Sequence, residues 1–280
     1  MILILLLSMF SIGYTNQINS VSGNIEKFSL MNGNSFINNT IDGVDNNLYK
    51  ISLIQYPGQI SLGQFLYIEK YKKYFIQSKI STINYGTLSD DNENNFKASD
   101  NIIEISIIKE SSNNLMLGSS IGYAWSRISD YRSSQLIHNI GMRYSLWNNR
   151  IIIGFSIENM VHTINEYSNI NSQYNHHHNL SIQLNPQHIN SSLFINYIYS
   201  NTNTSEAIVS FRSNINDHIS IFIGKSFYLT DASLDSQYLF YDNFSLGIGI
   251  IIPKYRINVG MQYLGDTGVV LGSSLIILVK

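Results

Sequence analysis

Large apolar residues recur at every second position through most of this 280-residue chain, with Gly, Ser, Asn or a charged residue between them. The segment 244–252, FSLGIGIII, shows the pattern most clearly. Because successive side chains of a β-strand point to opposite faces, such a strand has one apolar face and one small or polar face. The apolar face can meet a second sheet, as in a soluble sandwich, or lipid, as in an outer-membrane barrel. These two folds are the alternatives that the rest of the sequence must separate.

Composition favours the membrane fold and removes several functional classes. Charged residues make up 13% of the chain, against roughly 25% in a typical soluble domain. The net charge of -2 gives no reason to expect a nucleic-acid partner. Cysteine is absent, which excludes a disulfide framework and a thiol nucleophile. We also find no phosphate-binding glycine loop, and we expect neither an enzyme nor a cofactor.

Alternation and turn residues together predict about fourteen strands. They are expected at 49–55, 59–68, 73–83, 101–109, 115–126, 135–146, 150–160, 176–184, 188–199, 205–213, 217–226, 244–252, 255–263 and 269–279. Several have the ~9–11 residues that a tilted membrane strand needs.

The predicted connections differ in length at the two ends of the strands. Connections after even-numbered strands have five residues or fewer, at 69–72, 110–114, 147–149, 185–187, 214–216 and 253–254. Those after odd-numbered strands are longer on average, at 56–58, 84–100, 127–134, 161–175, 200–204, 227–243 and 264–268. Outer-membrane barrels have short periplasmic turns, longer extracellular loops and an even number of strands. We therefore predict an all-β fold, a single up-and-down antiparallel transmembrane β-barrel of about 14 strands over residues 49–280.

Charged residues within the strands indicate which face lines the lumen. An Arg or Lys at the lipid midplane costs about 2–4 kcal/mol, so inward positions are favoured. Five charged residues are out of phase with the large apolar side chains and are our polar candidates for the lumen: Glu104, Arg143, Glu158, Arg212 and Arg256. Lys225 is in phase with the lipid face, near a strand end where it can reach water. The tyrosines near strand ends are expected in interfacial girdles, namely Tyr123, Tyr144, Tyr199, Tyr255 and Tyr263.

The same register predicts a narrow lumen. Bulky side chains are expected to point inward at Phe65, Tyr67, Phe75 and Phe222. With charges of both signs on the wall, they would leave no open general pore. On strand 244–252, an Arg at Ile248 should damage assembly far more than a Ser at Gly249, which faces the lumen.

The N-terminal part is expected to lie outside the barrel wall. Residues 1–15 hold an apolar run of signal-peptide length, too short to span a bilayer as a helix. We expect a signal peptide there, with a buried first strand as the alternative. Residues 16–48 would then be a periplasmic or lumenal segment.

Three clusters could carry chemistry, and we expect none of them to do so. Adjacent His residues in a strand point to opposite faces, so in 176–178 at most His176 and His178 share one, and we expect no metal site. The acidic loop 90–95 offers oxygen ligands for calcium but lacks the EF-hand spacing. His138 falls on the lipid-side register, and we expect no serine elbow beside it.

A series of short motifs runs through residues 74–160. In order, they are INYGTL at 83–88, an acidic loop, FKASD at 96–100, LGSSIGY at 117–123, GMRY at 141–144 and IGFSIENM at 153–160. This layout resembles the PorV/PorQ branch of the FadL-like outer-membrane barrels. The upstream ISLIQYP at 51–57 also resembles the strand that precedes the INYGTL–FKASD hairpin, so the resemblance covers roughly residues 49–160. The remaining strands match that family by their rhythm alone. Members usually carry an N-terminal hatch with an Asn-Pro-Ala type motif, which residues 21–47 lack.

The resemblance implies a fourteen-stranded barrel in the outer membrane of a Gram-negative bacterium. PorV/PorQ-like barrels are non-enzymatic accessory components of type IX protein secretion, so secretion components or secreted cargo would be the partners, beside outer-membrane lipid. The alternative is a FadL-like channel for hydrophobic small molecules. A soluble secreted β-rich protein of adhesin type is a second alternative.

Overall fold

The computed structural model describes residues 47–89, 95–166, 176–200, 205–228 and 243–279. The expected signal peptide (1–15) and nearly all of the expected segment 16–48 lie outside these ranges. So do most of the acidic loop 90–95, most of the loop 161–175 and the expected loops around 201–204 and 229–242. These expectations therefore stay predictions.

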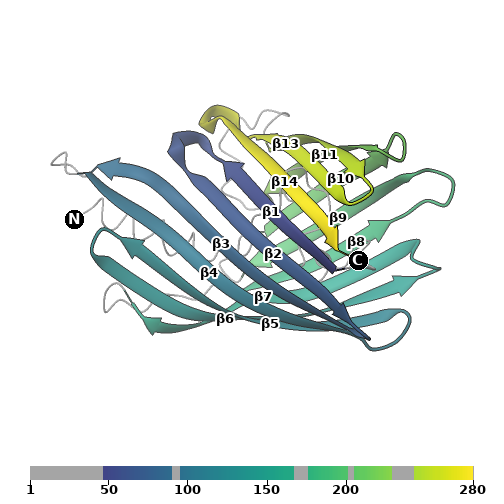
Figure 1. Cartoon of the computed structure of the whole chain (residues 1–280), viewed down its shortest axis with the longest axis horizontal. Coiled ribbons are helices and arrows are strands. Elements are labelled where there is room, and N and C mark those ends of the chain that lie inside the picture. Colours follow the sequence, from purple (N-terminus) through teal and green to yellow (C-terminus); the bar gives the residue numbers. More distant parts are fainter. Residues whose placement is uncertain (1–46, 90–94, 167–175, 201–204, 229–242, 280) are drawn as a thin grey trace.

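The described residues form fourteen strands that close into one antiparallel barrel (Figure 1). The strands are β1 (Asn47–Gln55), β2 (Ser61–Tyr71), β3 (Tyr74–Ser89), β4 (Asn95–Glu110), β5 (Leu115–Ile128), β6 (Tyr131–Leu146), β7 (Ile151–Asn165), β8 (His177–Leu184), β9 (Ser191–Ser200), β10 (Ser205–Asn214), β11 (Ile219–Tyr228), β12 (Phe244–Ile252), β13 (Tyr255–Tyr263) and β14 (Val269–Val279). Each strand pairs with its neighbours in chain order, and β1 closes the ring against β14. The predicted up-and-down barrel is confirmed, and a sandwich is excluded.

Two short 3-10 helices complete the described elements, η1 (Pro57–Gln59) and η3 (Gly265–Thr267). Both lie in connections between strands. Neither they nor any other helix in the described ranges is long and apolar enough to cross a membrane.

The outer surface of the barrel is apolar. Side chains in the outward register stay exposed to an extent that is unusual for large apolar groups, such as 62% for Leu53, 58% for Ile121 and 55% for Ile248. Their neighbours in sequence point inward and are buried, as at Ser120 and Gly249. A contiguous apolar surface around a whole barrel is stable in lipid and not in water. The alternation seen in the sequence therefore separates a lipid-compatible exterior from the lumen.

The short connections gather at one end of the barrel, here called the short-turn end, where β1 begins and β14 ends. They are 72–73, 111–114, 147–150, 185–190, 215–218 and 253–254. Asn side chains join neighbouring turns, because Asn185 Nδ2 donates to Asn149 O at 2.7 Å and Asn214 Nδ2 to Asn190 Oδ1 at 3.0 Å. The turn 185–190 is longer than predicted. The opposite end is called the loop end.

One side of the barrel is taller than the other at the loop end. Strands β3 to β7 have 14 to 16 residues each, whereas the others have 8 to 11. Ser61 at the start of β2 pairs with Asn84, so residues 85–89 of β3 continue beyond β2. We call this extension of β3 to β7 the raised wall (Figure 1). The predicted loops 84–100 and 127–134 are therefore wrong, because most of these polar residues belong to paired strands.

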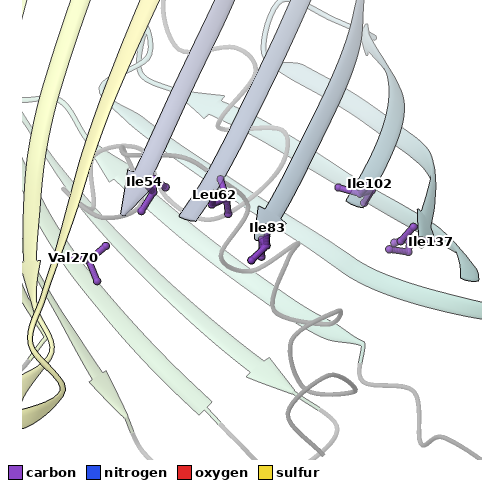
Figure 2. Packing of buried hydrophobic residues seen from close by; sticks show 7 residues of the cluster. Ile54, Leu62, Ile83, Ile102, Ile137 and Val270 are labelled. Atoms are coloured by element: carbon purple, nitrogen blue, oxygen red, sulfur yellow. The ribbon is translucent and has the colours of Figure 1, made fainter. Parts of the chain in front are cut away.

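The inner face has two apolar layers on the side formed by β1 to β7 and β14. One lies toward the loop end and contains Ile54, Leu62, Ile83, Ile102, Ala124, Ile137 and Val270 (Figure 2). The other lies toward the short-turn end and contains Leu48, Leu66, Ile68, Phe75, Ile108 and Ile276. Between these layers the inner face is polar.

Two of the four predicted lumen aromatics are wrong. Phe65 is 40% exposed on the outer face, and Tyr67 stacks there on Tyr49 with ring centroids 4.8 Å apart. Phe75 and Phe222 do point inward, and each is 1% exposed. The error arose in β2 because both of its faces carry large apolar residues, so period-two alternation could not tell inside from outside.

Candidate functional site

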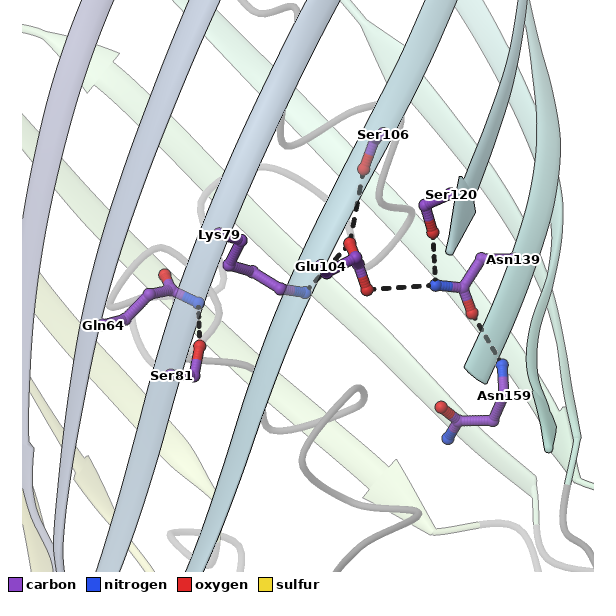
Figure 3. Close-up of polar contacts among 8 residues, drawn as sticks. All are labelled: Gln64, Lys79, Ser81, Glu104, Ser106, Ser120, Asn139 and Asn159. Atoms are coloured by element: carbon purple, nitrogen blue, oxygen red, sulfur yellow. Dashed lines mark hydrogen bonds and ion pairs between the residues drawn. The ribbon is translucent and has the colours of Figure 1, made fainter. Parts of the chain in front are cut away.

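Two hydrogen-bonded groups of polar side chains, the pair Gln64–Ser81 and a larger network around Glu104, lie side by side across the inner wall at mid-height. We call the two groups together the polar belt, and Figure 3 shows it: Gln64, Lys79, Ser81, Glu104, Ser106, Ser120, Asn139 and Asn159. Lys79 Nζ lies 3.2 Å from Glu104 Oε1, and Asn139 Nδ2 donates to Glu104 Oε2 at 3.2 Å. The same amide is 2.7 Å from Ser120 Oγ. Each charge in this network thus has a partner, which low-dielectric surroundings require.

A β-bulge in β7 anchors one end of the polar belt. The pairing of β6 with β7 shifts register between His138 and Ile140, and Asn159 takes a positive φ of 61°. Its backbone N–H donates to Asn139 Oδ1 at 2.8 Å. Asn tolerates the left-handed region better than most residues, which explains its use at this position. The bulge also turns both Glu158 and Asn159 into buried positions.

All five sequence-predicted lumen candidates lie in the inward register, but they do not form one site. Glu104 belongs to the polar belt, and Glu158 accepts a hydrogen bond from Ser156 Oγ at 2.6 Å. Arg143 is 8% exposed, and Arg212 lies over the ring of Phe194 at 5.6 Å. The arginines are near the short-turn end, whereas the two glutamates are farther up the wall.

Charges on the described inner face are ordered along the barrel axis. Cations occur one to five residues from the short-turn ends of their strands, at Lys50, Lys70, Lys79, Arg143, Arg212 and Arg256. Acids occur six to ten residues from those ends, at Asp100, Glu104, Glu158 and Glu206. Among the described acids of the inner face, Glu110 is the exception, and it pairs with Lys70 at 3.6 Å. The alternation of side chains along each strand predicts which of these groups point inward. Their heights along the barrel axis follow only from the register of all the strands.

A cavity of about 940 Å³ opens among the turns at the short-turn end. Its lining includes Arg143, Arg212 and Arg256, together with amide side chains from the turns. A second cavity of about 620 Å³ lies across β1, β2, β3, β13 and β14 and is lined mainly by apolar and small residues. The sequence alone gave no signal for either cavity, because each combines residues far apart in the chain.

The INYGTL and FKASD motifs meet in the raised wall. Tyr85 Oη donates to Asp100 Oδ2 at 2.5 Å, and Asp100 is 2% exposed. Gly86 has a φ of 74°, and a Cβ there would lie 3.2 Å from Gln59 Cβ. Its N–H donates to Asn84 Oδ1 at 2.9 Å. The residues that carry the family resemblance therefore fix the base of the raised wall against the β1–β2 connection.

His138 has a serine partner that the sequence analysis did not foresee. Its Nε2 lies 3.0 Å from Ser119 Oγ on the outer face of the barrel. Residues 118–122, GSSIG, also have the spacing of a hydrolase nucleophile motif. They lie within a strand and not in a strand-to-helix elbow, and Ser120 points inward to Asn139. The outward neighbours Leu136 and Ile140 are apolar, so neither can orient the imidazole as a catalytic triad requires. We therefore interpret the contact between His138 and Ser119 as a hydrogen bond that satisfies two polar side chains on an apolar surface.

The histidine cluster lies at the loop end of β8. The rings of His176 and His178 are 5.1 Å apart and edge to face, so these two share a side as expected. In the parts of the chain that the structure describes, no three His, Asp or Glu residues are grouped to hold a metal ion.

The predicted girdle tyrosines all lie on the outer face. Tyr144 and Tyr255 are near the short-turn end, whereas Tyr199 and Tyr263 are near the loop end. Tyr123 stacks on Trp125 with ring centroids 5.7 Å apart. Lys225 is half-buried on the outer face, with its ammonium 5.3 Å from the ring of Phe227.

Comparison with known proteins finds similar folds among solved structures. No protein-family model and no curated protein sequence matches the chain. The toluene transporter TodX of Pseudomonas putida superimposes with a TM-score of 0.57 at 9% identity, over 83% of this chain and 88% of that chain. A TodX deltaS2S3 mutant, a monoaromatic hydrocarbon channel, gives 0.56 at 10% identity, over 91% and 92%. A bacterial polysaccharide outer membrane secretin gives 0.51 at 8% identity, over 84% and 99%. The chain thus has the fold of the FadL-like outer-membrane barrels.

Proposed function

We propose that this protein is a non-enzymatic barrel of the outer membrane of a Gram-negative bacterium, and that it serves as an accessory component of type IX protein secretion. The raised wall is the observation that carries the proposal. A channel needs strands of ~9–11 residues to cross the membrane, so the extra length of β3 to β7 serves another purpose. A rigid sheet above the membrane offers a surface for a secreted protein or a secretion component.

The lumen supports the same proposal. The polar belt places a buried ion pair and several hydrogen-bonded amides in the wall at mid-height. An apolar solute that passed this level would desolvate these groups without offering a hydrogen bond in return, which is unfavourable. The short motifs that resemble the PorV/PorQ branch also form the base of the raised wall, where Tyr85 meets Asp100.

The membrane location is tested by fractionation. The protein is expected in the outer-membrane fraction. Its gel mobility should change on heating, because closed barrels stay folded in detergent until the sample is heated. Recovery from the soluble periplasm without detergent would contradict the proposal.

The secretion role is tested by co-purification from outer membranes with a tagged chain. Secretion components or cargo are expected with the wild type and with Tyr255→Ser, which alters an exposed outer tyrosine at the short-turn end. They are expected to be reduced with Tyr131→Ser, because Tyr131 is 60% exposed at the tip of the raised wall. If no secretion component accompanies the wild type, the secretion role is wrong.

A channel for hydrophobic small molecules is the second candidate. The fold likeness to the toluene transporter TodX favours it, as do the apolar inner layers on either side of the polar belt. Uptake of toluene into vesicles containing the pure protein, above that of empty vesicles, would support this function. Together with a failed co-purification, it would displace the secretion role.

A further inference from the structure

We propose that the outer face of the raised wall binds the phosphate groups of lipopolysaccharide, the anionic glycolipid of the outer leaflet of the outer membrane. The site consists of Arg127, Arg132 and Lys97, and we call it the basic patch. The inference rests on the outer-membrane location proposed above and does not depend on the secretion role.

Strand pairing places the three cations together on one face. Arg127 on β5 pairs directly with Arg132 on β6, so both side chains leave the same face of the sheet. Arg127 is four residues from Tyr123 along the strand, and that face is therefore the outer one. Arg127 also pairs with Ser99 on β4, and Lys97 lies two residues farther along, again on the outer face. All three cations are exposed.

The two arginines lack an anionic partner that would offset their charge. Cations directly opposite each other on a sheet repel, so this pairing is unfavourable unless an anion lies between them. Arg127 Nε donates to Ser129 O at 2.8 Å, which holds the guanidinium beside the turn and leaves its terminal nitrogens for another acceptor. Within the described residues, no carboxylate forms an ion pair with Arg127, Arg132 or Lys97. Asp130 in the turn between β5 and β6 is exposed, so the described patch has three cations and one acid.

The arginines are the main ligands of this site. The acidic residues of the connection 90–94 lie outside the described ranges and close to Lys97 in sequence. Lys97 is therefore assigned a supporting role, and the phosphate contacts are assigned to Arg127 and Arg132. A guanidinium binds phosphate through two parallel hydrogen bonds, which an ammonium does not offer.

The height of the basic patch matches the head groups of the outer leaflet. The loop end of an outer-membrane barrel faces the outside of the cell, and a strand needs ~9–11 residues to cross the membrane. Counted from the short-turn end of β5, Tyr123 and Trp125 are the ninth and eleventh residues, so their stacked rings lie at the outer interface. Arg127 is the thirteenth residue. The patch thus lies just above the aromatic rings, where lipid phosphates are expected.

The surface below the patch selects a lipid over a soluble phosphate. Outward side chains such as Ile121 and Leu136 are apolar and exposed, so they can contact acyl chains while the arginines contact phosphates. Basic clusters beside a membrane attract anionic head groups in this way. Lipid A, the phosphorylated and acylated part of lipopolysaccharide, has both kinds of group. A protein partner at Tyr131 would not compete with it, because Tyr131 pairs with Ile128 on the opposite face of the sheet.

Binding of lipid A to the full chain, refolded in neutral detergent, tests the proposal. Trp125 is the reporter, and Trp147→Phe removes the other tryptophan, which is 71% exposed at the short-turn end. Lipid A is expected to change the fluorescence of Trp125 in a saturable way. Lipid A without its phosphates keeps the acyl chains and should need at least about ten times the concentration, since it offers nothing to the arginines. Equal midpoints for the two lipids would overturn the proposal.

Variants in the same background assign the binding to the arginines. Arg132→Gln should weaken lipid A binding by about three- to tenfold, the effect of one basic residue at an anionic lipid surface. Arg127→Gln should weaken it at least as much, and Arg132→Lys, which keeps the charge, should retain part of the affinity. Lys73→Gln removes an exposed cation at the opposite end of the barrel and should leave the midpoint unchanged.

Heat-modifiable mobility confirms that each variant is folded before its midpoint is compared. If Arg132→Gln binds as well as the parent, or Lys73→Gln loses as much affinity, the site is not the basic patch. Failure of lipid A binding would leave the fractionation and co-purification results unchanged, because they measure other properties of the chain.

Discussion

At the scale of single residues, the free-energy cost of a charge on the outer face should depend on its depth in the membrane. Ile248 is in the middle of β12 and 55% exposed on the outer surface. Ile248→Arg places a cation at the lipid midplane, which costs about 2–4 kcal/mol. We expect a large loss of folded protein, measured as the heat-modifiable fraction after refolding into lipid vesicles.

Ile252→Arg is the matched control for this prediction. Ile252 shares the strand and the face of Ile248 but lies at the short-turn end. There the same charge costs about 0–1 kcal/mol. Equal losses in the two variants would show that the outer face does not meet lipid. Gly249→Ser, which the sequence suggested as a mild change, is unsuitable, because a Cβ there would lie 2.4 Å from Ser220 Oγ and 2.8 Å from Asn258 Oδ1.

The ion pair of the polar belt gives a second prediction at this scale. Glu104 is 1% exposed and pairs with Lys79, so Glu104→Leu leaves a buried ammonium without its carboxylate. We expect a loss of about 3–5 kcal/mol in the free energy of unfolding, measured by urea titration in lipid vesicles. The double variant Lys79→Met with Glu104→Leu should recover most of it. Asn139 would keep its hydrogen bond to Ser120 in both cases.

The pair Lys70–Glu110 is the control for burial. Its side chains are 28% and 29% exposed, and exposed pairs contribute about 0–1 kcal/mol. Glu110→Leu should therefore change stability much less than Glu104→Leu. If the two losses are similar, the belt is not a buried network.

At the scale of elements, the strands differ in how well their sequence predicts them. Strands β12, β13 and β14 begin and end as predicted, because large apolar residues alternate there with Gly, Ser and Asn and tight turns follow. Strands β3 and β4 extend well beyond their predicted ends. Their extra residues are polar and resemble a loop, and only pairing with each other makes them strands.

The bulge of β7 gives a prediction about one element. Asn159 has a φ of 61° and is buried, so a β-branched residue there would be strained while Gly would not. We expect Asn159→Val to destabilise the barrel by about 1–3 kcal/mol more than Asn159→Gly, measured by urea unfolding. Asn139→Leu removes the acceptor of the Asn159 N–H and should also destabilise. If Val is tolerated as well as Gly, the bulge is not fixed by its backbone conformation.

At the scale of the whole molecule, the sequence predicts the wall better than the sites. The alternation of apolar and polar residues along a single strand is enough to place Arg143, Arg212 and Arg256 in the inward register. That they line one cavity depends on the register of the eight strands from β6 to β13, which no local pattern encodes. The pairing of His138 with Ser119 was missed for the same reason, since the two residues are on different strands.

The last prediction concerns the lumen as a whole. Fourteen strands enclose less space than the 16–18 strands of general porins. Phe75 and Phe222 add bulk on the inner face, and the polar belt brings Lys79 and Glu104 together there. Phe65 and Tyr67 are on the outer face, so the expected narrow lumen depends on the inward rings of Phe75 and Phe222 and on the polar belt. We expect the purified protein in planar bilayers to show no large, stable, ohmic openings. Such openings would mean that the inner wall leaves a continuous water path, and they would favour a solute channel over a barrel that acts through its raised wall.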